Sequence, residues 1–178
     1  MKRNGNIHTK VYGTENLPAQ GGYIMYANHQ GKYDALGIIS GHEAPCTILM
    51  DAKRSKMILA DQFITLLKGN RLDKSNMKNQ MNSIISVIKE VKAGRRYIIF
   101  PEGGYQNNKN KVQEFLPGSF KCSLKSQSPI VPVALIDSYK PFGINSLKKV
   151  NTQVHFLEPI YYETYKDMNT REISCLVR

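Results

Sequence analysis

Residues 23–40 read YIMYANHQGKYDALGIIS and contain the unit from which the chain is built. Residues 23–27 form a short apolar run after a Gly-Gly pair, which predicts a buried β-strand. Residues 34–40 run up to Gly41, and we predict a helix that ends there. A polar turn, residues 28–33, joins the two. A strand followed by a helix in this way is the building unit of an α/β fold.

The same alternation continues along the chain. Apolar runs predict strands at residues 47–50, 97–100, 130–136 and 152–157, and helices at 55–67, 76–93 and 120–126. The helix at 76–93 has the clearest apolar stripe, formed by Met77, Met81, Ile84, Ile85, Ile88 and Val91. We therefore expect a single α/β domain over residues 1–178 with a mostly parallel, buried sheet.

Charge narrows the range of partners. The formal net charge is +11, from 25 Lys and Arg against 14 Asp and Glu, and such a charge attracts anionic partners. No helix-turn-helix pattern, RNP-like strand or Arg-rich tract is apparent, so we expect no nucleic-acid partner. The lysines are spread along the chain, which fits a solvated surface as well as an anionic membrane surface.

Cysteine usage and hydropathy bear on location. Cys46, Cys122 and Cys175 lie far apart without a CxxC or Cys/His cluster, which argues against a disulfide framework and a zinc site. This usage suits a reducing cytoplasm. We see no signal peptide and no apolar run near the roughly 20 residues of a spanning helix.

His29 and Asp34 are the first candidate pair. His29 lies between a strand and a helix, where α/β proteins place ligands. Five residues rotate by roughly 140° in a regular helix, so the two side chains meet only if the chain turns between them. Gly31 makes that turn easy, and Asp34 could then hold one imidazole nitrogen and leave the other as a base. A chance pairing is the alternative interpretation.

A second group of candidates lies further along the chain. Glu102, Gly103 and Gly104 directly follow a predicted strand, so that substrate could approach the backbone and the glycine N–H groups could face an oxyanion. A simple turn is the alternative. Arg71 and Lys74 lie in a polar turn between two predicted helices. The planar fork of arginine suits phosphate, although a solvated turn arginine is equally compatible with this position.

Four motifs stand in a fixed order: NHQGKYD at 28–34, NRLDK at 70–74, FPEGG at 100–104 and IVPVAL at 130–135. In this order they resemble the motifs of the PlsC-type glycerophospholipid acyltransferase family, which includes 1-acylglycerol-3-phosphate acyltransferases. The resemblance covers about residues 11–157. Each motif is common alone, but the four together are specific.

The resemblance implies a mixed, mostly parallel sheet wrapped by helices. It implies acyl transfer from acyl-CoA or acyl-carrier protein to the free hydroxyl of 1-acylglycerol-3-phosphate, without a metal, a cofactor or a covalent acyl-enzyme. His29 would be the general base and Asp34 its orienting partner. The residues that would bind substrate are Asn28, Arg71, Lys74, Glu102, Gly103 and Gly104.

The chain also departs from the family pattern. Gly31 stands where the family often has Ser, and Gly104 and Tyr105 stand where it often has Thr-Arg. The resemblance then implies a substitute phosphate ligand, for which the candidates are Lys109, Lys111 and Lys121.

Many family members carry apolar N-terminal helices that enter the membrane, whereas this sequence begins almost at its first strand. We therefore expect peripheral docking on the inner face of the cell membrane, through the basic surface or the helix at 55–67. Three alternatives to a lysophosphatidate acyltransferase stay open. They are an acyltransferase for glycerol-3-phosphate or another lysophospholipid, an esterase or thioesterase, and a non-catalytic lipid-binding protein.

Overall fold

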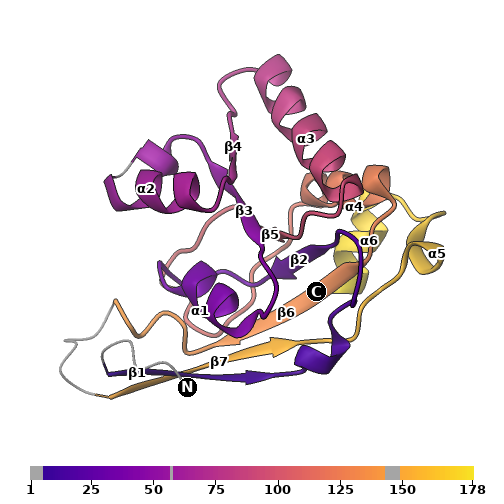
Figure 1. The fold of residues 1–178 in the computed structure, drawn as a ribbon. Helices are drawn as coiled ribbons and strands as arrows, with labels where there is room; N and C mark the ends of the chain where they lie inside the picture. The colour runs from indigo at the N-terminus through magenta and orange to yellow at the C-terminus, as the bar shows by residue number, and fades with distance from the viewer. Residues whose placement is uncertain (1–5, 57, 143–148) are drawn as a thin grey trace.

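The computed structural model describes residues 6–56, 58–142 and 149–178, which form a twisted seven-stranded sheet flanked by helices (Figure 1). The strands are β1 (Ile7–Tyr12), β2 (Ile24–Ala27), β3 (Thr47–Asp51), β4 (Asn70–Leu72), β5 (Tyr97–Ile99), β6 (Ile130–Ile136) and β7 (Val150–Phe156). The α-helices are α1 (Asp34–Gly41), α2 (Ile58–Leu66), α3 (Met77–Lys92), α4 (Lys121–Ser126), α5 (Tyr162–Tyr165) and α6 (Thr170–Val177). Short 3-10 helices include η2 (Arg54–Lys56) and η3 (Pro117–Phe120).

The strand order across the sheet is β1-β7-β6-β2-β5-β3-β4. β2 is parallel to both of its neighbours, β5 and β6, and β3 is parallel to β4 and β5. β7 is antiparallel to β6, and β1 is parallel to β7. The predicted mixed, mostly parallel sheet is thus confirmed. Because β5, β2 and β6 are parallel neighbours, their carboxyl ends lie side by side at one edge of the sheet.

Side chains of β2 alternate between two buried apolar clusters. Met25 belongs to one cluster with Ile38 of α1 and Ile64 of α2. Tyr26 belongs to the other with Val87 of α3, and α4 and α6 contribute to the same cluster. Burial on both faces explains why β2 is apolar throughout rather than alternating.

The predicted helix at 55–67 is split in the structure. Residues 54–56 form η2, and α2 begins only at Ile58. The Asp51 side chain causes this delay, because its Oδ1 accepts hydrogen bonds from the N–H groups of Lys53 and Arg54 at 2.9 and 3.3 Å. These bonds turn the chain after β3, and the helix can start only beyond that turn.

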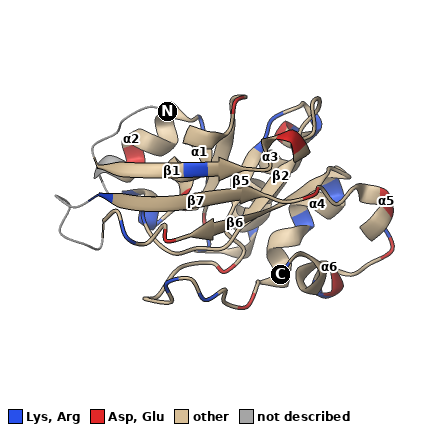
Figure 2. Cartoon of the chain, turned by 90° about the horizontal axis from the view of Figure 1, so that it is seen from below, with Lys and Arg blue, Asp and Glu red and all other residues tan. Residues whose placement is uncertain are grey.

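Other elements differ from the sequence prediction. Arg71, expected in a turn, lies on β4, because residues 70–72 pair with residues 49–51 of β3. β1, α5 and α6 have no counterpart in the prediction. Charged residues gather on helices and loops, whereas β6 and β7 carry no Lys, Arg, Asp or Glu (Figure 2). Within the described ranges, no helix combines the length and the apolar character that crossing a bilayer requires.

Candidate active site

The carboxyl edge of the three central strands brings together residues that lie far apart in the sequence. His29 follows β2, Glu102 follows β5 and Asp137 follows β6. The carboxyl edge of a parallel sheet is where α/β proteins commonly bind ligands.

His29 and Asp34 contact each other directly, with 2.7 Å between His29 Nδ1 and Asp34 Oδ2. The same oxygen accepts the N–H groups of Gln30 at 2.5 Å and Gly31 at 2.9 Å. Asp34 is fully buried at the start of α1, so the carboxylate is fixed in place. Because Oδ2 acts as acceptor in these contacts, the neutral imidazole carries its proton on Nδ1 and its lone pair on Nε2. This is the tautomer that a general base needs.

Aromatic rings hold the His29 imidazole from two sides. Phe100 stacks on it with 4.2 Å between ring centroids and 15° between planes. The Tyr105 ring meets it edge-on at 4.6 Å. The imidazole is still 16% exposed, so the ring is fixed in orientation without being sealed off from solvent.

Glu102 and the loop at 101–116 hold the His29 backbone. The His29 N–H donates to Glu102 Oε1 at 3.0 Å, and Asn108 Nδ2 donates to the His29 carbonyl at 3.1 Å. The other carboxylate oxygen, Glu102 Oε2, accepts from Gln113 Nε2 at 2.6 Å. Both oxygens of Glu102 are thus engaged by protein donors, and in this arrangement the residue positions His29.

Asn28 and Gln30 fasten the same turn to β6. Asn28 Nδ2 donates to the Leu135 carbonyl at 3.1 Å, and Asn28 Oδ1 accepts the Leu135 N–H at 2.7 Å. Gln30 donates to the Leu135 carbonyl at 2.7 Å and accepts the Ser138 N–H at 2.8 Å. Asn28 is 6% exposed, and both ends of its amide are used inside the protein. Asn28 therefore supports the turn, and its contact with substrate stays a prediction.

The two glycines after Glu102 differ in what they offer. Gly103 has φ of 73° and donates its N–H to the Phe100 carbonyl at 3.1 Å, so this N–H is taken by the turn. Gly104 has no described hydrogen bond from its N–H within the three described ranges. Of the two N–H groups expected to face an oxyanion, that of Gly104 is the one left to do so.

Arg54 is a site residue that the sequence analysis missed. A Cβ on Gly104 would lie only 2.8 Å from Arg54 Nη2, so the glycine makes room for this guanidinium. The guanidinium carbon lies 5.8 Å from the centroid of the Tyr105 ring, which itself contacts His29. Among the described residues, no carboxylate forms an ion pair with Arg54. A guanidinium without a carboxylate partner among the described residues therefore contacts Tyr105, which in turn contacts His29.

The predicted phosphate ligands Arg71 and Lys74 are both engaged with carboxylates. Arg71 Nη2 donates to Asp61 Oδ1 at 2.7 Å and to Thr65 Oγ1 at 3.1 Å, both on α2. Lys74 Nζ lies 3.5 Å from Asp51 Oδ2. Burial raises the pKa of Asp51, but the hydrogen bonds from Arg54 and Lys53 and the charge of Lys74 outweigh it, and the net pKa is lowered. Asp51 thus holds both the η2 turn and Lys74.

The three lysines considered as substitutes lie on two elements. Lys109 and Lys111 are exposed in the loop that carries Asn108, and Lys121 is exposed at the start of α4. The loop lysines are therefore tied to the site through the Asn108 bond to the His29 carbonyl. No group of three or more His, Cys, Asp or Glu side chains suited to a metal ion occurs in the described part of the chain.

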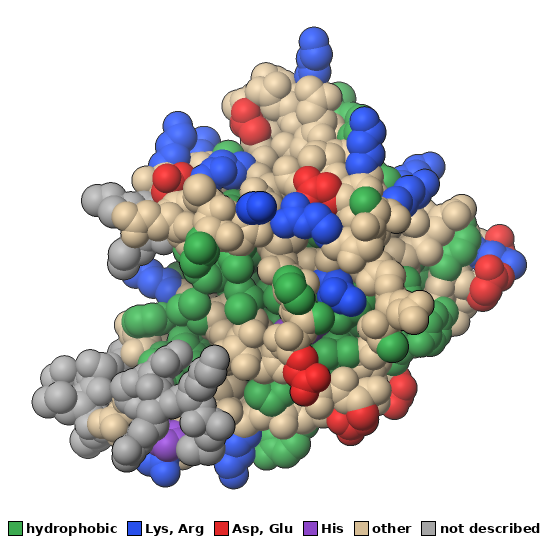
Figure 3. Space-filling view, viewed as in Figure 1, with side chains coloured by type: hydrophobic (Ala, Val, Ile, Leu, Met, Phe, Trp, Pro, Cys, Tyr) green, Lys and Arg blue, Asp and Glu red, His purple; other side chains and the backbone are tan. Residues whose placement is uncertain are grey.

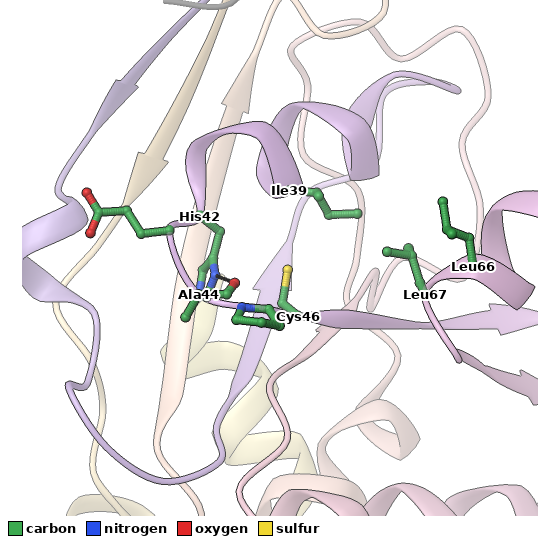
Figure 4. A pocket seen from close by; sticks show the side chains of 8 residues that line it. Ile39, His42, Ala44, Cys46, Leu66 and Leu67 are labelled. Carbon is green, nitrogen blue, oxygen red and sulfur yellow. Dashed lines mark hydrogen bonds between the residues drawn. The ribbon is translucent and has the colours of Figure 1, made fainter.

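A cleft of about 380 Å³ lies elsewhere, between the end of α1, the start of β3 and the end of α2 (Figure 4). Strand register puts Cys46 level with Tyr23, about 20 Å along the strands from His29. His42 donates from Nδ1 to the Ala44 carbonyl and accepts from the Tyr23 hydroxyl at Nε2. Burial lowers the pKa of His42 and raises that of Cys46 to about 11, so Cys46 is a thiol at neutral pH. This cleft holds no activated nucleophile.

Comparison with known proteins assigns the chain to a family. The sequence model of the acyltransferase family matches residues 8–136, which include the His29–Asp34 pair, Arg54 and Glu102. The chain belongs to the acyltransferase family. Among curated relatives, a 1-acyl-sn-glycerol-3-phosphate acyltransferase of Escherichia coli is 28% identical over 160 residues, 89% of this chain and 64% of that protein. A putative enzyme of the same name from Caenorhabditis elegans is 27% identical over 140 residues, 76% of this chain and 48% of that protein.

A solved structure shows the same fold. The crystal structure of the 1-acyl-sn-glycerophosphate acyltransferase PlsC from Thermotoga maritima superposes with a TM-score of 0.74 at 22% identity, and covers 96% of this chain and 69% of that one. The acyltransferase chain described here spans about half to two thirds of the length of the curated relatives quoted above.

Several supports of this candidate site carried no signal in the sequence. Two of these supports, Asn108 and Gln113, lie about 80 residues further along the chain than His29. The third is Gln30, a residue type that is common in loops. The polar run QNNKNK at 106–111 was recognisable only as a loop. Arg54 did have a signal, because it follows the carboxyl end of the predicted strand 47–50, as His29 and Glu102 follow theirs.

Proposed function

We propose that this acyltransferase moves an acyl group from a thioester donor to the free hydroxyl of 1-acylglycerol-3-phosphate. The observation that carries the proposal is the His29–Asp34 contact of 2.7 Å, which leaves Nε2 as an acceptor. The names of the curated relatives point to the same acceptor. The thioester donor is acyl-CoA or acyl-carrier protein.

The reaction follows from the tautomer. The acceptor hydroxyl donates a hydrogen bond to His29 Nε2, and its oxygen attacks the thioester carbonyl carbon. A C–O bond forms while the proton passes to Nε2, and Asp34 stabilises the imidazolium. When the tetrahedral intermediate collapses, the C–S bond breaks and the imidazolium returns the proton to the sulfur. No acyl-enzyme forms, and the Gly104 N–H is our candidate donor to the oxyanion.

Cationic groups would hold the acceptor phosphate. Arg54 is free of carboxylates among the described residues and lies beside Tyr105, whereas Arg71 and Lys74 would have to exchange Asp61 and Asp51 for phosphate. Arginine binds phosphate well because its fork donates two hydrogen bonds in one plane. Of these three cations, Arg54 is thus the one that would need to give up no described carboxylate.

The test is a thiol-release assay on the purified chain with both donors. The acceptors are lysophosphatidate, glycerol-3-phosphate, a lysophospholipid with a larger head group, and water alone. We expect release that depends on lysophosphatidate. Release without an acceptor would instead indicate a thioesterase, and release with another acceptor would reassign the substrate.

His29→Ala is the decisive variant in that assay. Loss of a general base costs about 10²- to 10⁴-fold in rate, and we expect a loss in this range with the circular dichroism spectrum unchanged. Asp34→Asn should also lower turnover strongly, because an amide cannot accept from all three donors and stabilise the imidazolium. Activity of His29→Ala within a few-fold of the unaltered chain would refute the mechanism.

A further inference from the structure

The first turns of α3 expose an apolar face. Met77 is 83% exposed, Met81 is 52% exposed and Ile85 is 41% exposed. These residues follow one another at intervals of four, so they form one stripe along the helix. Exposure of three large apolar side chains in a row is unusual on a soluble surface and indicates an interaction site.

The core holds a different side of α3. Val87 and Val91 are buried, and the helix packs against α4 and β4. Figure 1 shows α3 standing out from the body of the molecule, with its first turns farthest from the sheet. The stripe of Met77, Met81 and Ile85 therefore projects from the protein and is free to meet a flat partner.

Lysines border the stripe. At 100° per residue, Lys78, Lys89 and Lys92 fall within about 120° of Met77, on the same side as Met81 and Ile85. All three lysines are exposed, and none forms an ion pair with a described residue. In Figure 3, blue side chains project along the upper part of the molecule, where α3 lies, with green side chains among them.

Nearby acidic side chains face elsewhere. Glu90 accepts from Asn70, from the Tyr97 hydroxyl and from Arg95, which directs it toward the sheet. Asp73, just before the helix, accepts from Asn79 Nδ2. An apolar stripe with cations at its border and acids turned away is the pattern of a helix that lies in the interface of an anionic membrane.

The expected membrane contact, the helix at 55–67, fits this pattern less well. Phe63 and Leu67 pack against the core, and Asp61 is exposed on α2. Leu66, at 82% exposed, is the single large apolar side chain exposed among the described side chains of α2. Among the described side chains of α2, one exposed leucine beside an exposed carboxylate does not form an apolar stripe.

We propose that α3 is the membrane-docking element, with Met77, Met81 and Ile85 inserted among the lipids and Lys78, Lys89 and Lys92 on anionic headgroups. Charge selects this occupant, because a second copy would bring the same lysines against each other. α3 begins beyond the carboxyl end of β4, at the edge of the sheet where His29 lies, so docking brings the site toward the bilayer. The docking itself does not depend on the proposed function.

Tryptophan fluorescence gives a direct test, because the chain contains no tryptophan. Met81→Trp places a single reporter on the stripe, and Leu66→Trp places a matched one on α2. With vesicles of phosphatidylcholine and phosphatidylglycerol at low salt, we expect a blue shift of Met81→Trp emission and none for Leu66→Trp. A shift for Leu66→Trp alone would overturn the assignment in favour of α2.

Co-sedimentation with the same vesicles separates the two contributions. Met77→Gln with Met81→Gln should weaken binding about tenfold or more, since two apolar side chains that would insert among the lipids are lost. Lys78→Gln with Lys89→Gln should weaken it by about thirtyfold, roughly fivefold per lysine, and Lys10→Gln with Lys149→Gln is the charge-matched control on the β1 edge. Equal losses in the two lysine pairs would mean diffuse attraction, and the proposal would fail.

Two further controls keep the result interpretable. His29→Ala should bind vesicles like the unaltered chain, so docking can succeed or fail separately from catalysis. Light scattering of Met77→Gln with Met81→Gln tests the rival occupant. A fall from dimer to monomer with unchanged vesicle binding would show that the stripe joins two copies, and would refute membrane docking.

Discussion

Arg54 and Arg71 differ in what already binds their guanidinium groups, and this difference predicts which one matters for the acceptor. Arg71 is held by Asp61 and Thr65, whereas Arg54 has no described carboxylate partner and lies over Tyr105. Hydrogen bonds to charged groups are each worth about 1.5–3 kcal/mol. We therefore expect Arg54→Ala to raise the KM for lysophosphatidate about tenfold to a hundredfold, with the donor KM little changed.

Arg71→Ala and Arg54→Lys complete that measurement. Arg71→Ala should raise the acceptor KM less, because Asp61 competes for the guanidinium. Arg54→Lys should recover only part of the loss, since an ammonium lacks the planar fork. A larger effect of Arg71→Ala would move the phosphate to the β4 edge and contradict the assignment to Arg54.

Single residues were predictable where the chain itself brings them together. His29 and Asp34 are five residues apart with Gly31 between them, so a local turn suffices for their contact. Glu102 and Asn108 reach the backbone of His29 from more than 70 residues away, and nothing local marks them as its partners. A sequence readily shows which side chains could take part in chemistry. It shows much less readily which other side chains hold those groups in position.

At the scale of elements, close backbone contacts fix how strands and helices meet. A Cβ on Gly22 would lie 2.0 Å from the Val91 carbonyl oxygen and 2.7 Å from that of Arg95. The backbone just before β2 therefore packs directly against the end of α3. We expect Gly22→Ala to lower the free energy of unfolding by about 2–4 kcal/mol, because backbone atoms must move. Gly118→Ala is the matched control, since a Cβ there meets nothing within 4 Å.

Urea denaturation of the two glycine variants makes this comparison. Gly118→Ala should be close to the unaltered chain. If Gly22→Ala were equally stable, the approach of β2 to α3 would be looser than the structure shows.

In α3 the apolar sequence pattern and the observed burial differ. Six apolar residues at helical spacing predict one apolar stripe, yet of these six the structure buries only Val91 fully. β4, which packs beside α3, has three residues and cannot cover a helix of sixteen. Periodicity predicts that a face is apolar, whereas the length of the neighbouring strand decides how much of that face is buried.

For the whole molecule, strand order could not be predicted from the sequence. β1 pairs with β7, and Ile7 lies opposite Val150, more than 140 residues away. The alternation of elements indicated a mostly parallel sheet, but the antiparallel β6–β7 pair and the place of β2 between β5 and β6 depend on long-range packing. That central place is what sets His29 beside Glu102.

Asn28 connects the His29 turn to β6, so its loss should lower both stability and activity. Loss of His29 should lower mainly activity. Asn28→Ala would leave the Leu135 N–H without its partner, while the Leu135 carbonyl would keep Gln30. A buried unsatisfied donor costs about 1–3 kcal/mol, so Tm should fall by about 3–10 °C and activity with it. Asn107→Ala, at an exposed position of the 101–116 loop, is the control and should leave Tm unchanged.

His29→Ala should lose activity with a smaller fall in Tm, because Asp34 keeps the N–H groups of Gln30 and Gly31. Differential scanning calorimetry with the thiol-release assay distinguishes these patterns, and an Asn28→Ala variant with full stability but no turnover would assign Asn28 to the substrate.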